Sequence, residues 1–258
     1  MTTAKTPDQQ QLVASQFGPR AEAYVASAVH AQGEDLARIA GWAAARKPGR
    51  ALDLGCGGGH VAFALAPHAG EVVAYDLSPD MLAAVAATAK SKGLANIVTR
   101  QGPVESLPFA DASFDFVASR YSAHHWRGFD AALKEARRVL KPGGVAVFAD
   151  IFAPDDKLCD TWLQSVELLR DPSHQRDYSL REWRAALERA GFKPGRPYTH
   201  RLRLEFSSWL ARMATPPAQA EAIRALFAQA PAEVRAYLAL EADNSFSIDS
   251  MAMEAWPA

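Results

Sequence analysis

The feature that most constrains this sequence is a glycine-rich turn, Gly55-Cys56-Gly57-Gly58-Gly59, that follows a short apolar run. Residues 51–54 predict a buried strand, and a helix is expected over 59–65. Glycines permit positive φ and let the backbone approach a ligand closely. The helix N-terminus offers unpaired N–H groups to a carboxylate or phosphate, and Asp53 adds a negative charge beside them. The turn therefore predicts a site for a small ligand that carries both charge signs.

The turn lies at the start of a region in which strand and helix signals alternate. Strands are predicted over 51–54, 71–76, 96–100, 114–119 and 145–151, with helices over 59–65, 78–93 and 129–140 between them. Ser78 is expected to cap the second of these helices. This alternation requires parallel strands joined by helical crossovers, which gives an α/β, doubly wound sheet. Ligands of such sheets bind beyond the carboxyl ends of the strands. The residues expected at that edge are Asp53, Asp76, Gly102, Ser119 and Asp150.

The two flanks of this region differ from it. Residues 1–15 are polar and are expected to be frayed, whereas apolar residues recur at helical spacing over 15–46 and predict N-terminal helices. After residue 151, helices are predicted over 155–170 and over 179–191, the second opened by a capping box of Ser179 and Glu182. A sixth strand is predicted over 197–206, and a terminal strand over 245–254 completes a seven-stranded, mostly parallel sheet.

Residues 206–242 interrupt the sheet between its last two strands. Helices predicted over 209–213, 217–229 and 232–240 make this segment a helical insertion, which we expect to cover the site as a lid. The chain is thus interpreted as one domain over 1–258, with its ligand-binding core over 50–205 and a terminal segment over 243–258.

Composition limits the class of partner. The 258 residues carry a formal net charge of −1, which gives no electrostatic footprint for nucleic acid or an anionic membrane surface. No signal-peptide pattern and no stretch of membrane-spanning length is evident. Cys56 and Cys159 do not suggest a disulfide framework, so a cytoplasmic location is expected.

The dinucleotide-binding pattern G-x-G-x-x-G does not match the turn. Here the spacing is Gly55-x-Gly57-x-Gly59, and Asp53 would repel a pyrophosphate. A nicotinamide-dependent oxidoreductase is therefore disfavoured.

Further motifs follow the turn in a fixed order. They are Asp76 after the second strand, Gly102 followed by Glu105-Ser106-Leu107-Pro108-Phe109, then Phe114-Asp115-Phe116-Val117, and Leu140-Lys141-Pro142-Gly143-Gly144. Together with D-x-G-x-G-x-G at Asp53–Gly59, this order resembles the class I S-adenosylmethionine-dependent methyltransferases. The resemblance is closer still to the group similar to the ubiquinone and menaquinone C-methyltransferases. It implies a Rossmann-like methyltransferase fold, S-adenosyl-L-methionine as cofactor and S-adenosyl-L-homocysteine as product.

The resemblance also implies which residues bind the cofactor. Asp53 and the backbone of the turn should hold the methionine part, Asp76 the ribose hydroxyls, and Leu77 with Met81 the adenine. Pro103 stands where the family usually has an acidic residue, so the Val104 backbone or Glu105 is expected to replace it. Arg120 pairs with the cofactor carboxylate or with Asp115. The full predicted set is Tyr24, Asp53, Gly55, Cys56, Gly57, Gly59, Asp76, Leu77, Met81, Gly102, Val104, Glu105 and Arg120.

Methyl transfer is an in-line displacement that needs alignment, exclusion of water and, for some acceptors, a base. The segment after the fourth strand should face the methyl donor, and His124 and His125 are the candidate bases because imidazole titrates near neutral pH. The alternative is that one of the pair caps or packs. Tyr121, His174 and Arg176 are the candidate substrate-binding residues. No metal site is expected, because adjacent histidines rarely converge on one ion.

The sequence thus predicts methyl transfer to a small, apolar or aromatic molecule, with an oxygen, nitrogen or carbon acceptor left open. The alternative is a protein that binds S-adenosylmethionine without catalysis, motivated by Pro103. Nucleic-acid methylation is disfavoured, because Ser119-Arg120-Tyr121-Ser122 replaces the Asn- or Asp-Pro-Pro-aromatic run of amine-methylating nucleic-acid enzymes. A homodimer is considered as the assembly.

Overall fold

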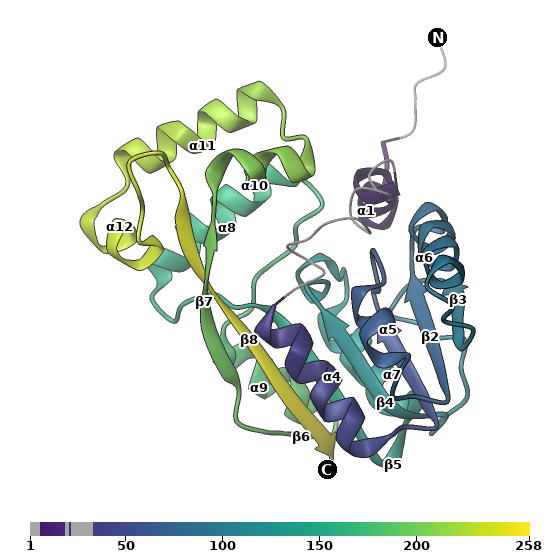
Figure 1. Ribbon diagram of the computed structural model, residues 1–258. Helices are drawn as coiled ribbons and strands as arrows, with labels where there is room; N and C mark the ends of the chain where they lie inside the picture. The colour runs from purple at the N-terminus through teal and green to yellow at the C-terminus, as the bar shows by residue number, and fades with distance from the viewer. Residues whose placement is uncertain (1–5, 19–20, 22–32) are drawn as a thin grey trace.

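An eight-stranded sheet forms the centre of this computed structural model, which describes residues 6–18, 21 and 33–258 (Figure 1). The strand order is β3-β2-β1-β4-β5-β8-β6, and β7 also pairs with β8. β8 is antiparallel to β5, β6 and β7, and the other pairings are parallel. The strands are β1 Arg50–Leu54, β2 Glu71–Asp76, β3 Ile97–Gln101, β4 Phe114–Arg120, β5 Leu140–Ile151, β6 Phe192–Pro194, β7 Tyr198–Leu204 and β8 Phe246–Pro257.

The predicted doubly wound, mostly parallel sheet is confirmed, but within the described ranges it has eight strands and not seven. The sequence analysis missed β6, because its Phe-Lys-Pro run is too short to alternate and contains a proline. β5 begins at Leu140, earlier than predicted. Leu140 pairs with Phe114 before a register shift, and regular pairing resumes where Val145 meets Phe116.

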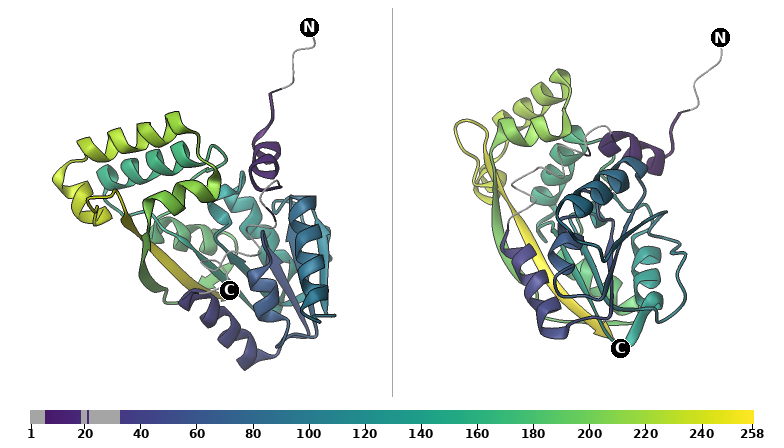
Figure 2. Two further views of the ribbon diagram at one scale, coloured as in Figure 1. Left: turned by 45° about the horizontal axis from the view of Figure 1, so that its top comes forward. Right: turned by 45° about the vertical axis from the view of Figure 1, so that its right-hand side comes forward.

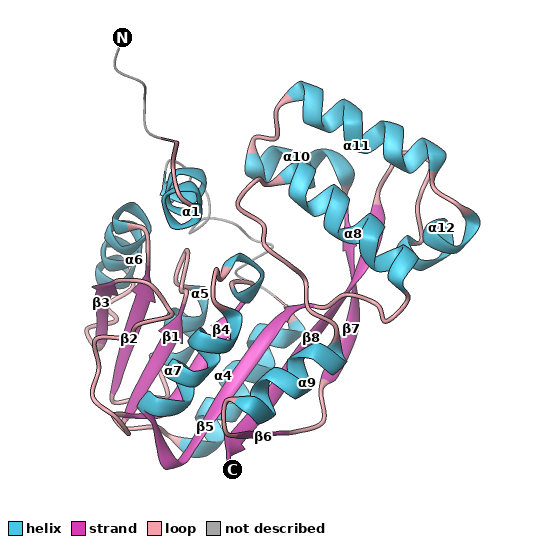
Figure 3. Cartoon of the chain, turned by 180° about the vertical axis from the view of Figure 1, so that it is seen from behind, coloured by secondary structure: helices cyan, strands magenta, loops and turns pink. Residues whose placement is uncertain are grey.

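Helices cover both faces of the sheet (Figures 1 and 3). One apolar cluster joins the sheet to α4, α5 and α6, and the other joins it to α7 and α9. No helix in the described part of the chain is long and apolar enough to cross a membrane. The helices flanking the sheet are α4 Glu34–Arg46, α5 His60–Leu65, α6 Pro79–Ser91, α7 Phe129–Val139 and α9 Leu180–Arg189, with a short 3-10 turn over Ala123–His125.

A separate helical layer lies at the end of the sheet where α1 (Gln9–Phe17) is also found, as two further views show (Figure 2). It contains α8 Lys157–Arg170 and the helices between β7 and β8, which are α10 Phe206–Met213, α11 Pro217–Gln229 and α12 Ala232–Leu238. A third apolar cluster holds this layer together, and Phe227 contacts Phe246 with ring centroids 5.3 Å apart. This packing ties the inserted helices to the start of β8.

The N-terminal prediction was wrong in one respect. Residues 9–17 form helix α1, although residues 1–15 were expected to be frayed. Asp8 and Gln11 form a capping box, in which the Asp8 side chain accepts from Gln11 N and the Gln11 side chain accepts from Asp8 N. This signal was present in the sequence, since Asp and Gln three residues apart can satisfy two backbone donors reciprocally.

Candidate functional site

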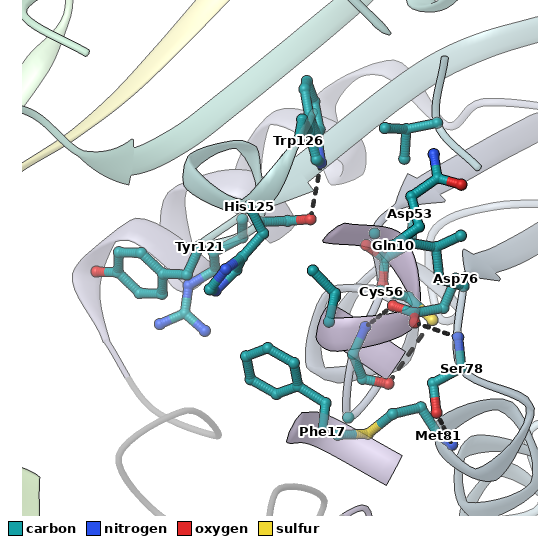
Figure 4. Close-up of a pocket in the computed structure, with 18 of the residues that line it drawn as sticks. Gln10, Phe17, Asp53, Cys56, Asp76, Ser78, Met81, Tyr121, His125 and Trp126 are labelled. Atoms are coloured by element: carbon teal, nitrogen blue, oxygen red, sulfur yellow. Dashed lines mark hydrogen bonds between the residues drawn. The ribbon is translucent and has the colours of Figure 1, made fainter. Parts of the chain in front are cut away.

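A first cavity, of about 1000 Å³ including its open mouth, lies at the carboxyl ends of β1, β2 and β4 and beside α1 (Figure 4). Such a volume suits a cofactor-sized ligand. His125 and Tyr121 lie on the opposite side of it from Asp76 and Ser78. Of the residues predicted to bind the cofactor, Asp53, Gly55, Cys56, Gly57, Asp76, Leu77, Met81, Val104, Glu105 and Arg120 line it. Tyr24 lies outside the described residues.

The glycine turn is held against the second strand. The N–H groups of Gly55 and Cys56 both donate to Tyr75 O at 2.9 Å. A Cβ on Gly55 would lie 1.9 Å from Ser122 Oγ, so the close approach of the two segments requires glycine. Gly57 has a φ of +47°, and a Cβ there would meet no described atom within 4 Å. The Gly57 backbone therefore faces the open cavity.

Asp53 is a buried carboxylate at the end of β1. Its Oδ2 accepts from Ala62 N, in the first turn of α5, at 2.8 Å. Burial raises the pKa of Asp53 to about 7. The bond to Ala62 fixes one carboxylate oxygen, and the side chain still lines the cavity.

Asp76 lies at the end of β2, the strand that pairs with β1. Its Oδ2 accepts from Gly57 N at 2.8 Å and its Oδ1 from Ser78 N at 2.9 Å. Burial raises the pKa of Asp76. Ser78 caps α6 by accepting from Met81 N at 3.3 Å, as the sequence predicted. The Asp76 carboxylate therefore links the glycine turn to the start of α6 while it faces the cavity.

Two of the predicted glycines serve the backbone and do not line the first cavity among the described residues. Gly59 is the left-handed N-cap of α5. A Cβ on Gly102 would lie 2.1 Å from the Tyr75 hydroxyl, which donates to Pro103 O at 3.2 Å. Glu105 does line the cavity, and it accepts from Gly128 N at 3.0 Å and from Gln10 Nε2 at 3.3 Å.

Helix α1 contributes Gln9, Gln10 and Val13, which were not predicted from the sequence to line the site. They line the first cavity together with Phe17. Phe17 packs edge-on against His125, with ring centroids 5.0 Å apart. Gln9 Nε2 donates to His125 O at 2.8 Å and to Ser173 O at 3.2 Å. These bonds fasten α1 to two loops on the other side of the site.

Replacing Gln9 by Ala is expected to weaken binding of S-adenosylhomocysteine by roughly tenfold, because the two lost bonds contribute on the order of 1 kcal/mol or more. Isothermal titration measures the effect. Ser15→Ala is the matched control, because Ser15 Oγ donates only to Leu12 O of its own helix. Equal affinities for the two variants would contradict the anchoring role of Gln9.

Arg120 is the last residue of β4, and Tyr121 is the first residue after it. Arg120 forms a buried ion pair with Asp35 of α4. The alternative partner, Asp115, instead pairs with Lys141 at 2.7 Å, so that alternative was wrong. Tyr121 has a left-handed φ of +50°, a conformation that costs on the order of 1 kcal/mol and is typical of functional sites. A contact of 3.1 Å between its hydroxyl and Ser250 Oγ helps to hold it.

A second cavity adjoins the first and shares Phe17, Arg120, Tyr121 and His125 with it. Its lining combines apolar and charged side chains. The apolar ones come from β5, β7, β8 and α10, and are Ile151, Leu202, Leu204, Trp209, Met213 and Ile248. The charged ones include Glu167, Arg170, Asp171 and Asp177, from α8 and the loop that follows it, and Arg212 of α10.

The two adjacent histidines have opposite charge states at neutral pH. Burial lowers the pKa of His124, but the charge of Asp150 and a 2.6 Å contact between His124 Nδ1 and Asp150 Oδ1 outweigh it and raise the pKa to about 9. Burial, followed by the charge of His124, lowers the pKa of His125 to about 4. His125 lines both cavities, whereas His124 lines the second. The sequence could not separate their roles.

His174 and Arg176 are not among the described residues that line these two cavities. His174 is buried, with Nε2 2.9 Å from Gln164 Oε1, and Arg176 pairs with Asp160 at 2.9 Å. Both brace the loop after α8, so their positions do not support the predicted contact with substrate. No group of three or more His, Cys, Asp or Glu in the described ranges is arranged to hold a metal ion.

Comparison with known proteins gives the same result for family and fold. Residues 52–148 match the family model of a methyltransferase domain. An uncharacterized methyltransferase of Bacillus subtilis, YcgJ, is 38% identical over 78% of this chain and 79% of its own length. The crystal structure of YcgJ has a TM-score of 0.82, at 32% identity, and covers 86% of this chain and 97% of its own.

Two further relatives show how far the similarity extends. The uncharacterized protein YafE of Escherichia coli is 49% identical over 76% of this chain and 95% of its own length. A demethylmenaquinone methyltransferase of Geobacillus kaustophilus is 38% identical, but over only 42% of this chain and 48% of its own length. The fold, the strand-end cavity and these similarities together establish that the chain belongs to the class I S-adenosylmethionine-dependent methyltransferases.

Proposed function

We propose that the protein transfers the methyl group of S-adenosylmethionine, bound in the first cavity, to a small molecule bound in the second. The observation that carries this proposal is that the two cavities share Phe17, Arg120, Tyr121 and His125. A transfer between two bound molecules requires such a common boundary, because the reacting atoms must be held close and aligned.

The first cavity fits the cofactor. The Gly57 backbone faces open space, and Leu77 and Met81 offer apolar contact to an adenine. Each oxygen of the Asp76 carboxylate accepts one backbone bond and can accept a second from a ribose hydroxyl. Glu105 lines the same cavity, two residues after Pro103, the position at which the family usually has an acidic residue. When bound, S-adenosylmethionine supplies an electrophilic methyl group on a positively charged sulfur, which becomes a neutral thioether.

The chain must then align the acceptor and take up its proton. His125 is neutral at pH 7, and its Nδ1 lies 3.3 Å from Ser173 O, so Nδ1 carries the hydrogen and Nε2 can accept a proton. His124 is already protonated. As the acceptor atom bonds to the methyl carbon, the carbon–sulfur bond breaks with its electron pair on sulfur, and the acceptor's proton passes to His125 Nε2.

The inserted helices complete the second cavity, because α10 contributes Trp209, Arg212 and Met213 to its lining. We therefore propose that residues 206–242 act as the lid over the acceptor. The homodimer, the cytoplasmic location, and the absence of nucleic-acid and metal partners remain predictions from the sequence.

The test is to measure S-adenosylhomocysteine binding by titration calorimetry and then its release from S-adenosylmethionine with a panel of phenols, amines and carbon acids. We expect binding, and release with at least one class. His125→Gln should reduce turnover by about tenfold with the cofactor affinity unchanged, a modest effect because a base with a pKa of about 4 is weak. Binding without any release would favour the alternative of a non-catalytic binding protein.

A further inference from the structure

The second cavity contains a buried carboxylate that the fold does not use. Asp177 is 2% exposed and lines this cavity, and its Oδ2 has no hydrogen-bond partner among the described residues. A buried polar atom without a partner costs free energy in the folded state. Native structures retain such groups at few places, and each calls for an explanation.

The nearest cation candidate does not satisfy Asp177. His174 Nε2 lies 4.0 Å from Asp177 Oδ2, beyond hydrogen-bond distance, and is instead 2.9 Å from Gln164 Oε1. Burial, with the charge of His124 second, lowers the pKa of His174 to about 2, so its ring is neutral. His174 therefore supplies neither a hydrogen bond nor a charge to the carboxylate. Burial raises the pKa of Asp177 well above its ordinary value, and the charge of His124 opposes this only in part.

Several other charges that line the cavity are paired, and Arg212 of α10 adds a cation to the lining. Asp35 pairs with Arg120, Glu167 with Arg170 at 3.3 Å, and the His124 cation with Asp150. Asp171 uses Oδ1 to accept from Ser173 N and Oγ, at 2.8 and 2.6 Å. Its Oδ2 lies 3.9 Å from His125 Nε2. With His125 neutral, this end of the cavity presents acceptors toward a ligand: Asp171 Oδ2, His125 Nε2 and Asp177 Oδ2.

The cavity is also lined by the Trp209 indole, on which the Arg170 guanidinium stacks, and by aliphatic side chains of β5, β7 and β8. An apolar body would bury itself there, whereas the acceptor-rich end would take a group that donates hydrogen bonds and carries positive charge. A negatively charged group would face two carboxylates in a site of low dielectric.

We propose that the methyl acceptor is a small amine with an apolar body, whose ammonium group is bound by Asp177 and Asp171. The ammonium gives one proton to the Asp177 carboxylate, because only the neutral amine has a lone pair for the methyl carbon, and the methylated product leaves as an ammonium ion. This inference rests on the proposed function, because it takes the second cavity as the acceptor site. The missing partner of Asp177 is then supplied by the substrate. Asp177 is a binding residue. Its unpartnered oxygen lowers the stability of the ligand-free protein and is available to bind the substrate.

The first experiment measures binding in the presence of saturating S-adenosylhomocysteine, with three probes of one shape: 2-phenylethylamine, 2-phenylethanol and 3-phenylpropanoate. The amine should bind at least tenfold more tightly than the other two. Asp177→Asn should remove that preference and leave S-adenosylhomocysteine affinity within twofold. Asp155→Asn, at a side chain 73% exposed, is the matched control and should change neither affinity.

Tighter or equal binding of the alcohol or acid, no binding of the amine, or an amine preference that survives in Asp177→Asn would each overturn the inference. Failure of S-adenosylhomocysteine to bind the wild type would instead contradict the proposed function.

The second experiment needs no ligand. At a pH above the raised pKa of Asp177, Asp177→Asn should raise the melting temperature of the free protein by about 2–4 °C, since relief of a poorly compensated buried charge of ~1 kcal/mol shifts a domain of this size by that much. A lower melting temperature would show that Asp177 supports the fold and would overturn the inference.

Discussion

Replacing Asp76 by Ala is expected to weaken binding of S-adenosylhomocysteine by at least roughly 100-fold. The substitution removes both carboxylate oxygens proposed to accept the ribose hydroxyls, and hydrogen bonds to a charged group contribute about 1.5–3 kcal/mol each. It also leaves Gly57 N and Ser78 N without their acceptor, which loosens the turn that faces the cofactor. Titration calorimetry measures the affinity directly.

Asp76→Asn removes the negative charge of the side chain but keeps its shape. It keeps one oxygen acceptor and should lose less affinity than Asp76→Ala. Asp80→Asn is the matched control, because Asp80 lies four residues further along the chain, in the exposed first turn of α6. If Asp76→Ala and Asp80→Asn bound S-adenosylhomocysteine equally well, Asp76 would not be a cofactor ligand.

Replacing Asp150 by Asn is expected to destabilise the protein by about 3 kcal/mol, because it breaks a buried charged network. Asp150 accepts from Ala123 N at 2.9 Å and from Ile151 N at 2.8 Å, in addition to its contact with His124 Nδ1. An amide at this position places an N–H₂ group against one of these donors. Urea unfolding measures the loss, and Asp249→Asn, at a part-exposed pair with Arg201, is the control.

The loss of stability caused by Asp150→Asn is expected to depend on pH. The folded-state pKa of His124 is about 9, above its unfolded value of about 6.5, so the stabilisation from this pair is fully present below pH 6.5 and is lost as pH rises through 9. The stability difference between the wild type and Asp150→Asn should therefore be largest near pH 6 and shrink toward pH 10. An NMR titration of His124 should show its pKa falling in the variant. A stability difference independent of pH would mean that Asp150 acts only through its backbone bonds.

The first half of the fold could be predicted from the sequence because its signals are local. Strand β1, the glycine turn and α5 follow one another within a few residues, and backbone conformation, helix capping and apolar periodicity act over that range. The serine cap at Ser78 and the capping box at Ser179 were predicted correctly for the same reason. Net charge and motif order likewise need no tertiary information.

The organisation of the acceptor side was decided only by the tertiary structure. Arg120 pairs with Asp35, which lies 85 positions away in the sequence, and Gln9 donates a hydrogen bond to Ser173, which lies 164 positions away. The difference between His124 and His125 depends on burial and on Asp150, which no local pattern encodes. The sequence by itself determined the family and the methyl-donor turn, because short-range backbone chemistry specifies both. Only the fold brought Asp171, Asp177 and His125 to one cavity, because long-range packing decides which polar groups lose water and which are left to meet a ligand.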